Sequence, residues 1–577
     1  MTLGLQLVNY VLIYPIQSVL PLCAAFTAWR LLGPRGPHGV KAAASSAAAI
    51  ASATQKTTFL SWFAARSGRQ IVRLYVQIEL FTALYYLIRR QMLQRKPLVP
   101  QRNQSSEERR ALLTRCHLSI DQMDFSDEED NDDENGDEGD GEGAENSNSL
   151  SKTLSTTSVE QLLRDWSEDV AVVKNKSDVD EKKLSVPTRR RSSPRRLALK
   201  RAAVSGWFLG APVLSIRRGN LEQWVSWAFF LKRRHNLSKD EMVEVSELVD
   251  QVVAWAQLTN VRDGYDESVR CIRLDFDPIP SSYRPFIYYL VTYGLVGIAT
   301  EIIMGSFFGF EKHTSGCLTY WYRPPGGDEK SEPVGGTTDE PLVLCHGLGI
   351  GVLSYVTLVN DLLSNPKQSR SSMFMVELPH ISMRPVETQA SPRELCTCIE
   401  DLLTAHDKTT AHFVGHSFGT LVLTWIARHT PHVVSRFTFL DPVCFLLCKH
   451  DVAYNFLYKK PTNATEALMK YFVGQELFIS FTLSRRFRWT SNILWPEQIV
   501  GIPSTVVLSS EDYIVPSHAV RRFLVSWERR RMKGCSDGHK GGGGLKVVWL
   551  DGCGHAGFLS TPAAQKRVVE AIVTKLK

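Results

Sequence analysis

The C-terminal part of the chain predicts an α/β fold built on a mostly parallel sheet. From residue 340 onward, short apolar runs alternate with helical stretches, and each run is followed by a turn containing Gly or Pro. The runs expected as strands are 341–345, 373–378, 412–415, 436–440, 504–509 and 546–550, with helical patterns at 392–405 and 419–428. Strands that alternate with helices pair in parallel, and the active sites of such sheets lie at the carboxyl ends of the strands.

Length and composition allow more than this one domain. The chain has 577 residues, of which 44% are hydrophobic, so part of it can bury a sizeable core. The net charge of +7 is modest, but residues 126–145 are almost entirely Asp, Glu, Gly and Asn, whereas 188–201 are strongly basic. The eleven cysteines have no regular spacing, which argues against a structural zinc site and favours reduced thiols.

Residues 1–100 are expected to anchor the chain in a membrane. Residues 5–29 carry no charged side chain and are long enough to span the hydrocarbon core, while basic residues follow the run. This order favours a signal anchor with the catalytic part in the cytosol, with a buried helix or a cleaved signal as alternatives. A second apolar segment, 71–88, contains charged side chains, so it is expected either to span or to lie in the interface. The expected compartment is the endoplasmic reticulum or a lipid-droplet surface.

Residues 101–203 are predicted to be a disordered linker, because high charge with few aromatic residues cannot bury enough surface to fold. Within it, 189–194 (RRRSSP) resembles a site for a basophilic kinase, so phosphorylation is expected to regulate the linker. The same basic block could contact an anionic membrane surface. Nucleic acid is not an expected partner, since no binding fold accompanies the block.

Residues 204–337 predict a helical accessory region. Residues 221–232 have the pattern of a helix with an aromatic face, and Ser238 with Glu241 forms a capping box ahead of another helix. A third apolar segment, 285–310, is rich in aromatic residues and short for a span. It is expected to be buried, or to lie along the membrane interface beside the catalytic domain.

The pentapeptide Gly415-His416-Ser417-Phe418-Gly419 is the strongest chemical signal in the sequence. It follows a predicted strand and opens a predicted helix, which is the context that a nucleophile elbow requires. The two glycines permit the crowded turn that lifts the serine above the sheet. The sequence therefore predicts Ser417 as a nucleophile.

A second motif, His346-Gly347-Leu348-Gly349, comes directly after the first strong strand. This H-G-x-G segment resembles the loop that supplies one N–H group of an oxyanion hole, with Leu348 as the donor residue. The backbone N–H of Phe418 would be the second donor. Two preformed N–H groups stabilise the charge that develops on a carbonyl oxygen under attack.

Asp512 and His555 complete the predicted site. Asp512 follows the strand at 504–509, and His555 follows the last strand. A serine hydroxyl needs a base to take its proton, and the base needs a carboxylate to fix its tautomer. Glu511 and Asp441 remain alternatives for the acid. Competing histidines that do not follow the last strand are His380, His406, His412 and His416.

These motifs together resemble the α/β-hydrolase superfamily, especially its lipase, esterase and monoacylglycerol-lipase-like branch. The resemblance covers about 338–577, and the order Ser, Asp, His agrees with it. It implies a doubly wound sheet with a helical cap inserted before the strand that carries the acid. Residues 443–500, long and aromatic-rich, fit such a cap, whereas 531–544 are expected to form a flexible loop.

The predicted activity is therefore hydrolysis of carboxylic esters through an acyl-enzyme, without a metal or cofactor, and lipid esters are the expected substrates. Serine rather than Asp at the elbow favours attack on a carbonyl. An acyltransferase would use the same site, with an alcohol replacing water. A third possibility is a membrane scaffold whose hydrolase domain is vestigial.

Overall fold

The structure is a computed structural model, and it describes residues 58–96, 98, 104–124, 194–326, 340–366, 368–533 and 544–575. Several segments with predictions lie outside these residues: the span at 5–29, the acidic block at 126–145, the kinase-like segment before Pro194 and the loop at 534–543. The segments predicted as membrane anchor and linker are therefore described only in part.

An eight-stranded sheet forms the centre of the catalytic part, with the strand order β1-β2-β4-β3-β5-β6-β7-β8. The pairs β1–β2 and β2–β4 are antiparallel, and all other pairs are parallel. The strands are β1 (Glu311–Ser315), β2 (Leu318–Arg323), β3 (Leu342–Cys345), β4 (Met373–Glu377), β5 (Ala411–His416), β6 (Val434–Leu440), β7 (Ser504–Ser509) and β8 (Leu545–Leu550). The prediction of a mostly parallel sheet is confirmed.

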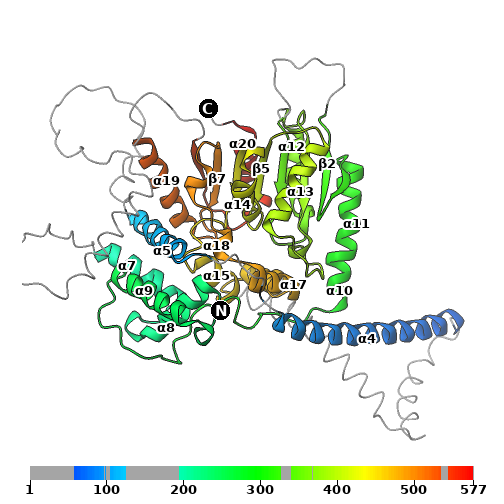
Figure 1. Cartoon of the computed structure of the whole chain (residues 1–577). Coiled ribbons are helices and arrows are strands. Elements are labelled where there is room, and N and C mark those ends of the chain that lie inside the picture. Colours follow the sequence, from blue (N-terminus) through cyan, green and yellow to red (C-terminus); the bar gives the residue numbers. More distant parts are fainter. Residues whose placement is uncertain are drawn as a thin grey trace, which may run out of the picture.

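Helices cover both faces of this sheet (Figure 1). The larger helices are α12 (Val356–Ser364), α13 (Pro392–Ala405), α14 (Gly419–His429), α19 (Ser517–Lys533) and α20 (Pro562–Val573). Alternate residues of β3 point into two separate cores: Val343 packs with Leu421 of α14, and Leu344 packs with Leu358 of α12. Because successive side chains of a strand point to opposite faces, the two cores show that the sheet is doubly wound.

The sheet begins earlier than the predicted domain boundary at 338. Strands β1 and β2 lie in the segment predicted as a helical accessory region, 204–337, and this assignment is wrong for residues 311–323. Trp321 of β2 is buried and donates a hydrogen bond from Nε1 to Glu377 of β4 at 2.8 Å. The hairpin is a half-buried edge with a mixed pattern of side chains, and such a pattern is a weak strand signal.

The accessory region consists of four main helices. They are α5 (Ser106–Asp121), α7 (Pro194–Trp207), α8 (Arg218–Phe230) and α9 (Lys239–Trp255). The predicted capping box of Ser238 is present at the start of α9. The prediction of disorder throughout 101–203 is wrong for α5 and for the start of α7. Lys200 is buried there and pairs with Asp121 at 3.0 Å, so charges that suggested a solvated linker join two helices.

The segment expected to form a cap lies between β6 and β7 as a run of short helices (Figure 1). They are α15 (Asp451–Ala453), η10 (Tyr454–Tyr458), α16 (Ala464–Met469), η11 (Lys470–Gly474), α17 (Leu477–Phe481), η12 (Thr482–Arg486), α18 (Trp489–Asn492) and η13 (Pro496–Ile499). Many of their apolar side chains are buried in the same core as those of α14.

Two helices in the described ranges are long and apolar enough, by length and composition, to cross a membrane: Gln70–Arg95 and Phe286–Phe307. The first belongs to α4 (Thr58–Arg95), and the second joins α10 (Phe286–Tyr289), η5 (Leu290–Leu295), α11 (Val296–Thr300) and η6 (Glu301–Phe307). In Figure 1, α4 runs across the bottom, whereas α10 and α11 run up the side of the sheet. Of the two expectations for 285–310, burial does not hold along the whole segment, since Ile298 and Phe307 are 60% and 76% exposed, whereas the membrane-interface alternative stays a prediction.

The acidic residue of the second apolar segment faces the protein. Glu79 is completely buried, and its carboxylate accepts hydrogen bonds from the Tyr283 hydroxyl and from the backbone N–H of Phe286, the latter at 3.0 Å. On the same side, Tyr86 packs with Phe478 of α17. One face of α4 is thus attached to the catalytic part. Other faces expose large apolar side chains, namely Ile71, Leu74, Phe81, Leu84, Leu87, Ile88 and Met92.

Candidate active site

Ser417 lies in the sharp turn between β5 and α14. Its φ of +50° is left-handed, a strained conformation for a residue with a side chain. The flanking glycines make the turn possible: a Cβ on Gly415 would lie 2.8 Å from a backbone oxygen of Gly419, and a Cβ on Gly419 would lie 2.1 Å from the carbonyl oxygen of Cys345. The structure thus gives the predicted elbow a steric basis.

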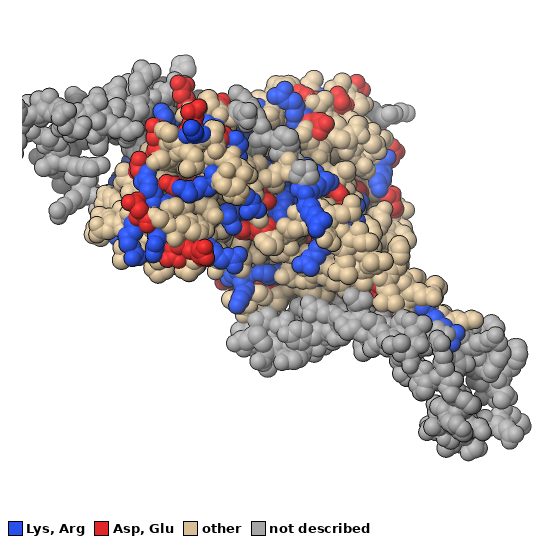
Figure 2. All heavy atoms as spheres, turned by 60° about the horizontal axis from the view of Figure 1, so that its bottom comes forward, with Lys and Arg blue, Asp and Glu red and all other residues tan. Residues whose placement is uncertain are grey.

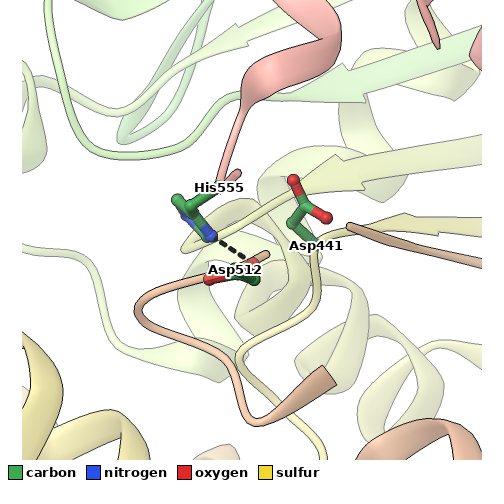
Figure 3. Close-up of side chains that lie close together, drawn as sticks. All are labelled: Asp441, Asp512 and His555. Atoms are coloured by element: carbon green, nitrogen blue, oxygen red, sulfur yellow. Dashed lines mark hydrogen bonds and ion pairs between the residues drawn. The ribbon is translucent and has the colours of Figure 1, made fainter. Parts of the chain in front are cut away.

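The structure brings Ser417, His555 and Asp512 into one hydrogen-bonded chain. His555 Nε2 lies 2.8 Å from Ser417 Oγ, and His555 Nδ1 lies 2.7 Å from Asp512 Oδ2. Figure 3 shows the imidazole facing this carboxylate. The other oxygen of Asp512 accepts the backbone N–H groups of Ile514 and Val515, each at 2.8 Å. Asp512 is therefore held as an acceptor on both oxygens.

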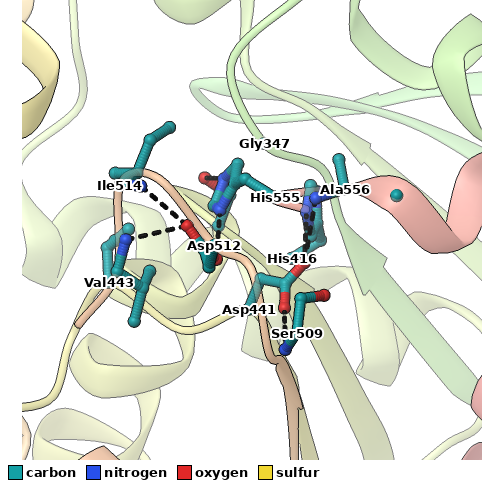
Figure 4. Close-up of polar contacts among 12 residues, drawn as sticks. Gly347, His416, Asp441, Val443, Ser509, Asp512, Ile514, His555 and Ala556 are labelled. Carbon is teal, nitrogen blue, oxygen red and sulfur yellow. Dashed lines mark hydrogen bonds and ion pairs between the residues drawn. The ribbon is translucent and has the colours of Figure 1, made fainter. Parts of the chain in front are cut away.

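The alternative acids occupy different positions. Glu511 is exposed, whereas Asp441 is buried at the end of β6. Asp441 accepts the backbone N–H of Ser509 at 3.0 Å and that of Ala556 at 2.9 Å, as Figure 4 shows. It thus ties the end of β7 to the residue after His555. No hydrogen bond joins it to the imidazole, so Asp512 is the acid partner and Asp441 a neighbouring charge.

These charges tune the histidine. Burial opposes protonation of His555, but the carboxylates of Asp512 and Asp441 outweigh it and raise its pKa above the ordinary value. Burial, together with the charge of Asp512, raises the pKa of Asp441 to about 6. By contrast, burial and the nearby His555 lower the pKa of His416 well below its ordinary value, so His416 stays neutral. The negative charges of Asp512 and Asp441 therefore favour the His555 imidazolium that forms during proton transfer.

Three of the competing histidines contact residues other than Ser417. His406 Nε2 lies 3.1 Å from the Tyr320 hydroxyl, and His412 Nε2 lies 2.9 Å from Thr438 Oγ1. A further histidine, His380, is buried beside Phe418, with a ring-centroid distance of 5.9 Å. None of these three rings bonds to the serine hydroxyl.

The predicted oxyanion loop lies beside the serine. Leu348 and Phe418 line the same cavity as Ser417, and within the described ranges no backbone acceptor is found for the N–H of either residue. The backbone N–H of Leu378 donates to His346 Nε2 at 2.9 Å, so His346 carries its proton on Nδ1, which faces the Gly347 carbonyl at 2.7 Å. The His346 imidazole therefore holds the oxyanion loop through contacts with Leu378 and Gly347.

Sequence reasoning missed Tyr355. Its hydroxyl accepts the backbone N–H of Gly347 at 2.8 Å and lies 2.6 Å from Nδ1 of His416. Because His416 belongs to the elbow, Tyr355 links the oxyanion loop to the elbow. It is buried and comes from a short 3-10 turn, η7 (Gly351–Tyr355), which carries no recognisable motif.

A largely apolar cavity opens above Ser417. The cap contributes many of its walls, including Phe456, Leu483 and Phe487. The accessory region contributes Trp207, Trp227, Ala228, Leu231 and Leu274, which no motif identified. Charged side chains in the wall are Asp275, Lys449 and Arg488. Two regions that are distant in sequence thus enclose one site.

Asp441, Asp512 and His555 also form the one cluster in the described ranges whose ligand atoms lie close enough to hold a metal, all within 4.8 Å. These atoms already have partners. Asp512 bonds to His555, and both oxygens of Asp441 accept backbone N–H groups. The arrangement is that of an acid–base pair with a second, structurally engaged carboxylate.

Comparison with known proteins agrees with this geometry. Residues 342–568 match the sequence model of the alpha/beta hydrolase family. The chain has no match among curated proteins. Similar solved structures include a membrane phospholipase A described as a bacterial virulence factor (15% identity, 50% of this chain and 94% of that chain, TM-score 0.33) and naproxen esterase from Bacillus subtilis (14%, 48% and 97%, TM-score 0.32). Residues 342–568 of this chain thus match the alpha/beta hydrolase family in sequence, and the doubly wound sheet and the elbow are consistent with that match.

Proposed function

We propose that the protein is a membrane-associated serine hydrolase that cleaves lipid carboxylic esters through an acyl-enzyme. The observation that carries this proposal is the aligned chain from Ser417 Oγ through His555 to Asp512, at 2.8 Å and 2.7 Å, at the base of an apolar cavity. A hydroxyl on a strained turn, a base with a raised pKa and unused N–H groups are the parts that acyl transfer requires.

Each residue then has one task. His555 Nε2 takes the proton of Ser417 Oγ as the oxygen attacks the ester carbonyl, and the N–H groups of Leu348 and Phe418 receive the developing oxyanion. His555 returns the proton to the leaving alcohol, which leaves the acyl group on Ser417. Water attacks this acyl-enzyme in a second round of the same proton transfers. Asp512 holds the imidazole in the tautomer that both rounds require.

The cavity walls support a lipid substrate. Tryptophan, phenylalanine and leucine side chains surround Ser417, and burial of a long acyl chain against them is favourable by about 0.8 kcal/mol per methylene group. A small polar ester would leave most of this surface unfilled. Hence we expect the rate to rise with acyl length until the cavity is full.

Exposed apolar helices support membrane association. The faces of α4 directed away from the cap carry Leu74, Phe81 and Leu84, and Phe286–Phe307 adds a second exposed apolar surface. Figure 2 shows charged side chains spread over the left and middle of the underside and a mostly uncharged area at its right. The large apolar side chains exposed on these two helices mark a contact surface, and a bilayer is the contact that supplies lipid esters.

The first test is labelling with a fluorophosphonate probe. Wild type and a Ser364→Ala control, which changes an exposed serine of α12, are expected to label, whereas Ser417→Ala is expected not to. Ester cleavage should be lost in parallel. A folded wild type that neither labels nor cleaves esters would refute the proposal and favour the scaffold alternative. Release of free fatty acid, rather than a new ester when an acceptor alcohol is added, would separate hydrolysis from acyl transfer.

Membrane association is tested by flotation with phosphatidylcholine vesicles. The double variant Phe81→Glu/Leu84→Glu should float less than wild type, because it places two charges on the exposed apolar face of α4. Gln91→Glu, at an exposed polar position of the same helix, is the control. Equal flotation of all three proteins would show that this face does not contact the bilayer.

A further inference from the structure

A second hollow adjoins the catalytic cavity. It is an open groove, bounded by α5, the start of α13, α14 and the cap segment 486–498. Arg488 and Thr490 line both the groove and the cavity that contains Ser417. Arg488 and Thr490 therefore form a wall that is common to the two spaces.

Arg488 has unused hydrogen-bonding capacity. One terminal nitrogen, Nη1, lies 3.1 Å from Oδ2 of Asp275, which also accepts Trp227 Nε1 at 3.0 Å. Its Nε and Nη2 atoms are buried and have no partner in the described ranges, although the side chain is only 12% exposed. Buried donors of a charged group are normally bonded, and a guanidinium fork with free Nε and Nη2 matches two oxygens of one anion.

The groove around Arg488 is cationic. Its wall contains four arginines, Arg115, Arg428, Arg486 and Arg488. Arg115 pairs with Glu497, but Arg428 donates only to uncharged acceptors, among them the carbonyl oxygen of Ser491 at 2.6 Å, and Arg486 has no carboxylate partner in the described ranges.

The same wall contains two acidic residues. Glu108 and Glu394 line the groove, but each carboxylate accepts the backbone N–H of an N-cap serine, at 2.8 Å in both cases. They are committed to the capping boxes of α5 and α13. The wall therefore contains four arginines against two glutamates, an excess of positive charge that suits an anionic ligand.

We infer that the groove is a head-group site for an anionic, phosphate-bearing lipid ester, with Arg488 as its specificity-determining residue. The acyl chain lies in the apolar cavity with its carbonyl at Ser417, and the phosphate lies in the groove against Arg488 and Arg486. This inference rests on the proposed function, because it assigns the substrate class of the same site.

Asp275 offers the competing explanation for Arg488. If the arginine served only to neutralise this buried carboxylate, Arg488→Gln would leave an unpaired charge and weaken the fold. One nitrogen suffices for that pairing, and Trp227 already bonds the same oxygen. Asp275→Asn separates the two explanations: it removes the carboxylate, so a role in neutralisation disappears, whereas a head-group site keeps or increases its affinity for phosphate.

Binding is measured without catalysis, using ether-linked 1-alkyl-glycerol-3-phosphate and the matched 1-alkyl-glycerol. Binding is followed by the fluorescence of the tryptophans in the cavity wall, and neither ligand contains an ester that could be cleaved. Wild type should bind the phosphate ligand about 10- to 100-fold more tightly than the neutral ligand, as expected for charge-assisted hydrogen bonds. Arg488→Gln should lose most of this ratio, while Arg234→Gln, at an exposed arginine of the accessory region, should keep it.

Hydrolysis of the two matched acyl esters gives a second readout. Arg488→Gln should raise KM for the phosphate ester by a much larger factor than KM for the neutral ester, because only the phosphate ester loses a charged partner. Equal binding of both ligands by wild type, or a proportional loss for both in Arg488→Gln, would overturn the inference. If neither ester is cleaved but the phosphate ether binds with the expected ratio, the proposed function fails and the anion site stands.

Discussion

Asp512→Asn is the substitution that tests the catalytic geometry most sharply. Oδ1 of Asp512 accepts two backbone N–H groups, from Ile514 and Val515, and only an oxygen can replace it there. The new amide nitrogen must therefore take the place of Oδ2, 2.7 Å from His555 Nδ1. Two donors would then face each other, so the imidazole must give up its Nδ1 proton and carry it on Nε2 instead.

A proton on Nε2 removes the base from the reaction, because that nitrogen has to accept the proton of Ser417. The expected loss in kcat is about 10,000-fold, which corresponds to about 5.4 kcal/mol in activation free energy. The melting temperature should change little, since the two backbone bonds persist. Steady-state hydrolysis of a p-nitrophenyl ester and a thermal unfolding scan provide both readouts. Retention of more than a tenth of the wild-type kcat, with a large loss in Asp441→Asn instead, would refute the assignment.

Three further substitutions probe other parts of the site. Asp441→Asn removes a charge that raises the pKa of His555, so the acidic limb of the pH profile of kcat/KM should move to lower pH. An unchanged acidic limb would show that the charge of Asp441 does not affect the pKa of His555. Gly419→Ala should destabilise the fold by about 1–3 kcal/mol or more, since its Cβ would overlap a backbone carbonyl, whereas Gly297→Ala, with open space around it, should not. Ala228→Leu narrows the cavity and should lower kcat/KM for long-chain relative to short-chain esters by about tenfold; equal effects would place Ala228 outside the acyl path.

The core of the catalytic part could be predicted from sequence because its strands are buried on both faces. Such strands appear as continuous apolar runs, and β3, β4, β5 and β7 all follow this pattern. The elbow could be predicted because its glycines are required sterically by nearby backbone. Asp512 was harder to separate from Glu511 and Asp441, since the choice depends on which carboxylate the fold turns toward His555.

Other features depend on contacts between distant residues, and a single sequence does not record these. Lys200 belongs to a basic block that reads as a solvated linker, but its partner Asp121 lies in another helix. Glu79 seemed to interrupt an apolar segment, whereas the structure gives it a partner at Phe286. In each case a charge that indicates exposure is buried, because a hydrogen-bonding partner compensates for the lost hydration. Local composition cannot reveal that compensation.

The placement of the accessory region has a consequence for catalysis. Trp227 of α8 donates a hydrogen bond to Asp275, and Asp275 pairs with Arg488 of the cap. Through these contacts the accessory region holds the wall of the cavity above Ser417. On the other side of the cap, α17 packs against α4 through Phe478. The cap is therefore fixed between the accessory region and an apolar surface helix. A hydrolase fold cut out at its sequence boundary would lose one wall of the acyl cavity and the support of the other, and its elbow would face water.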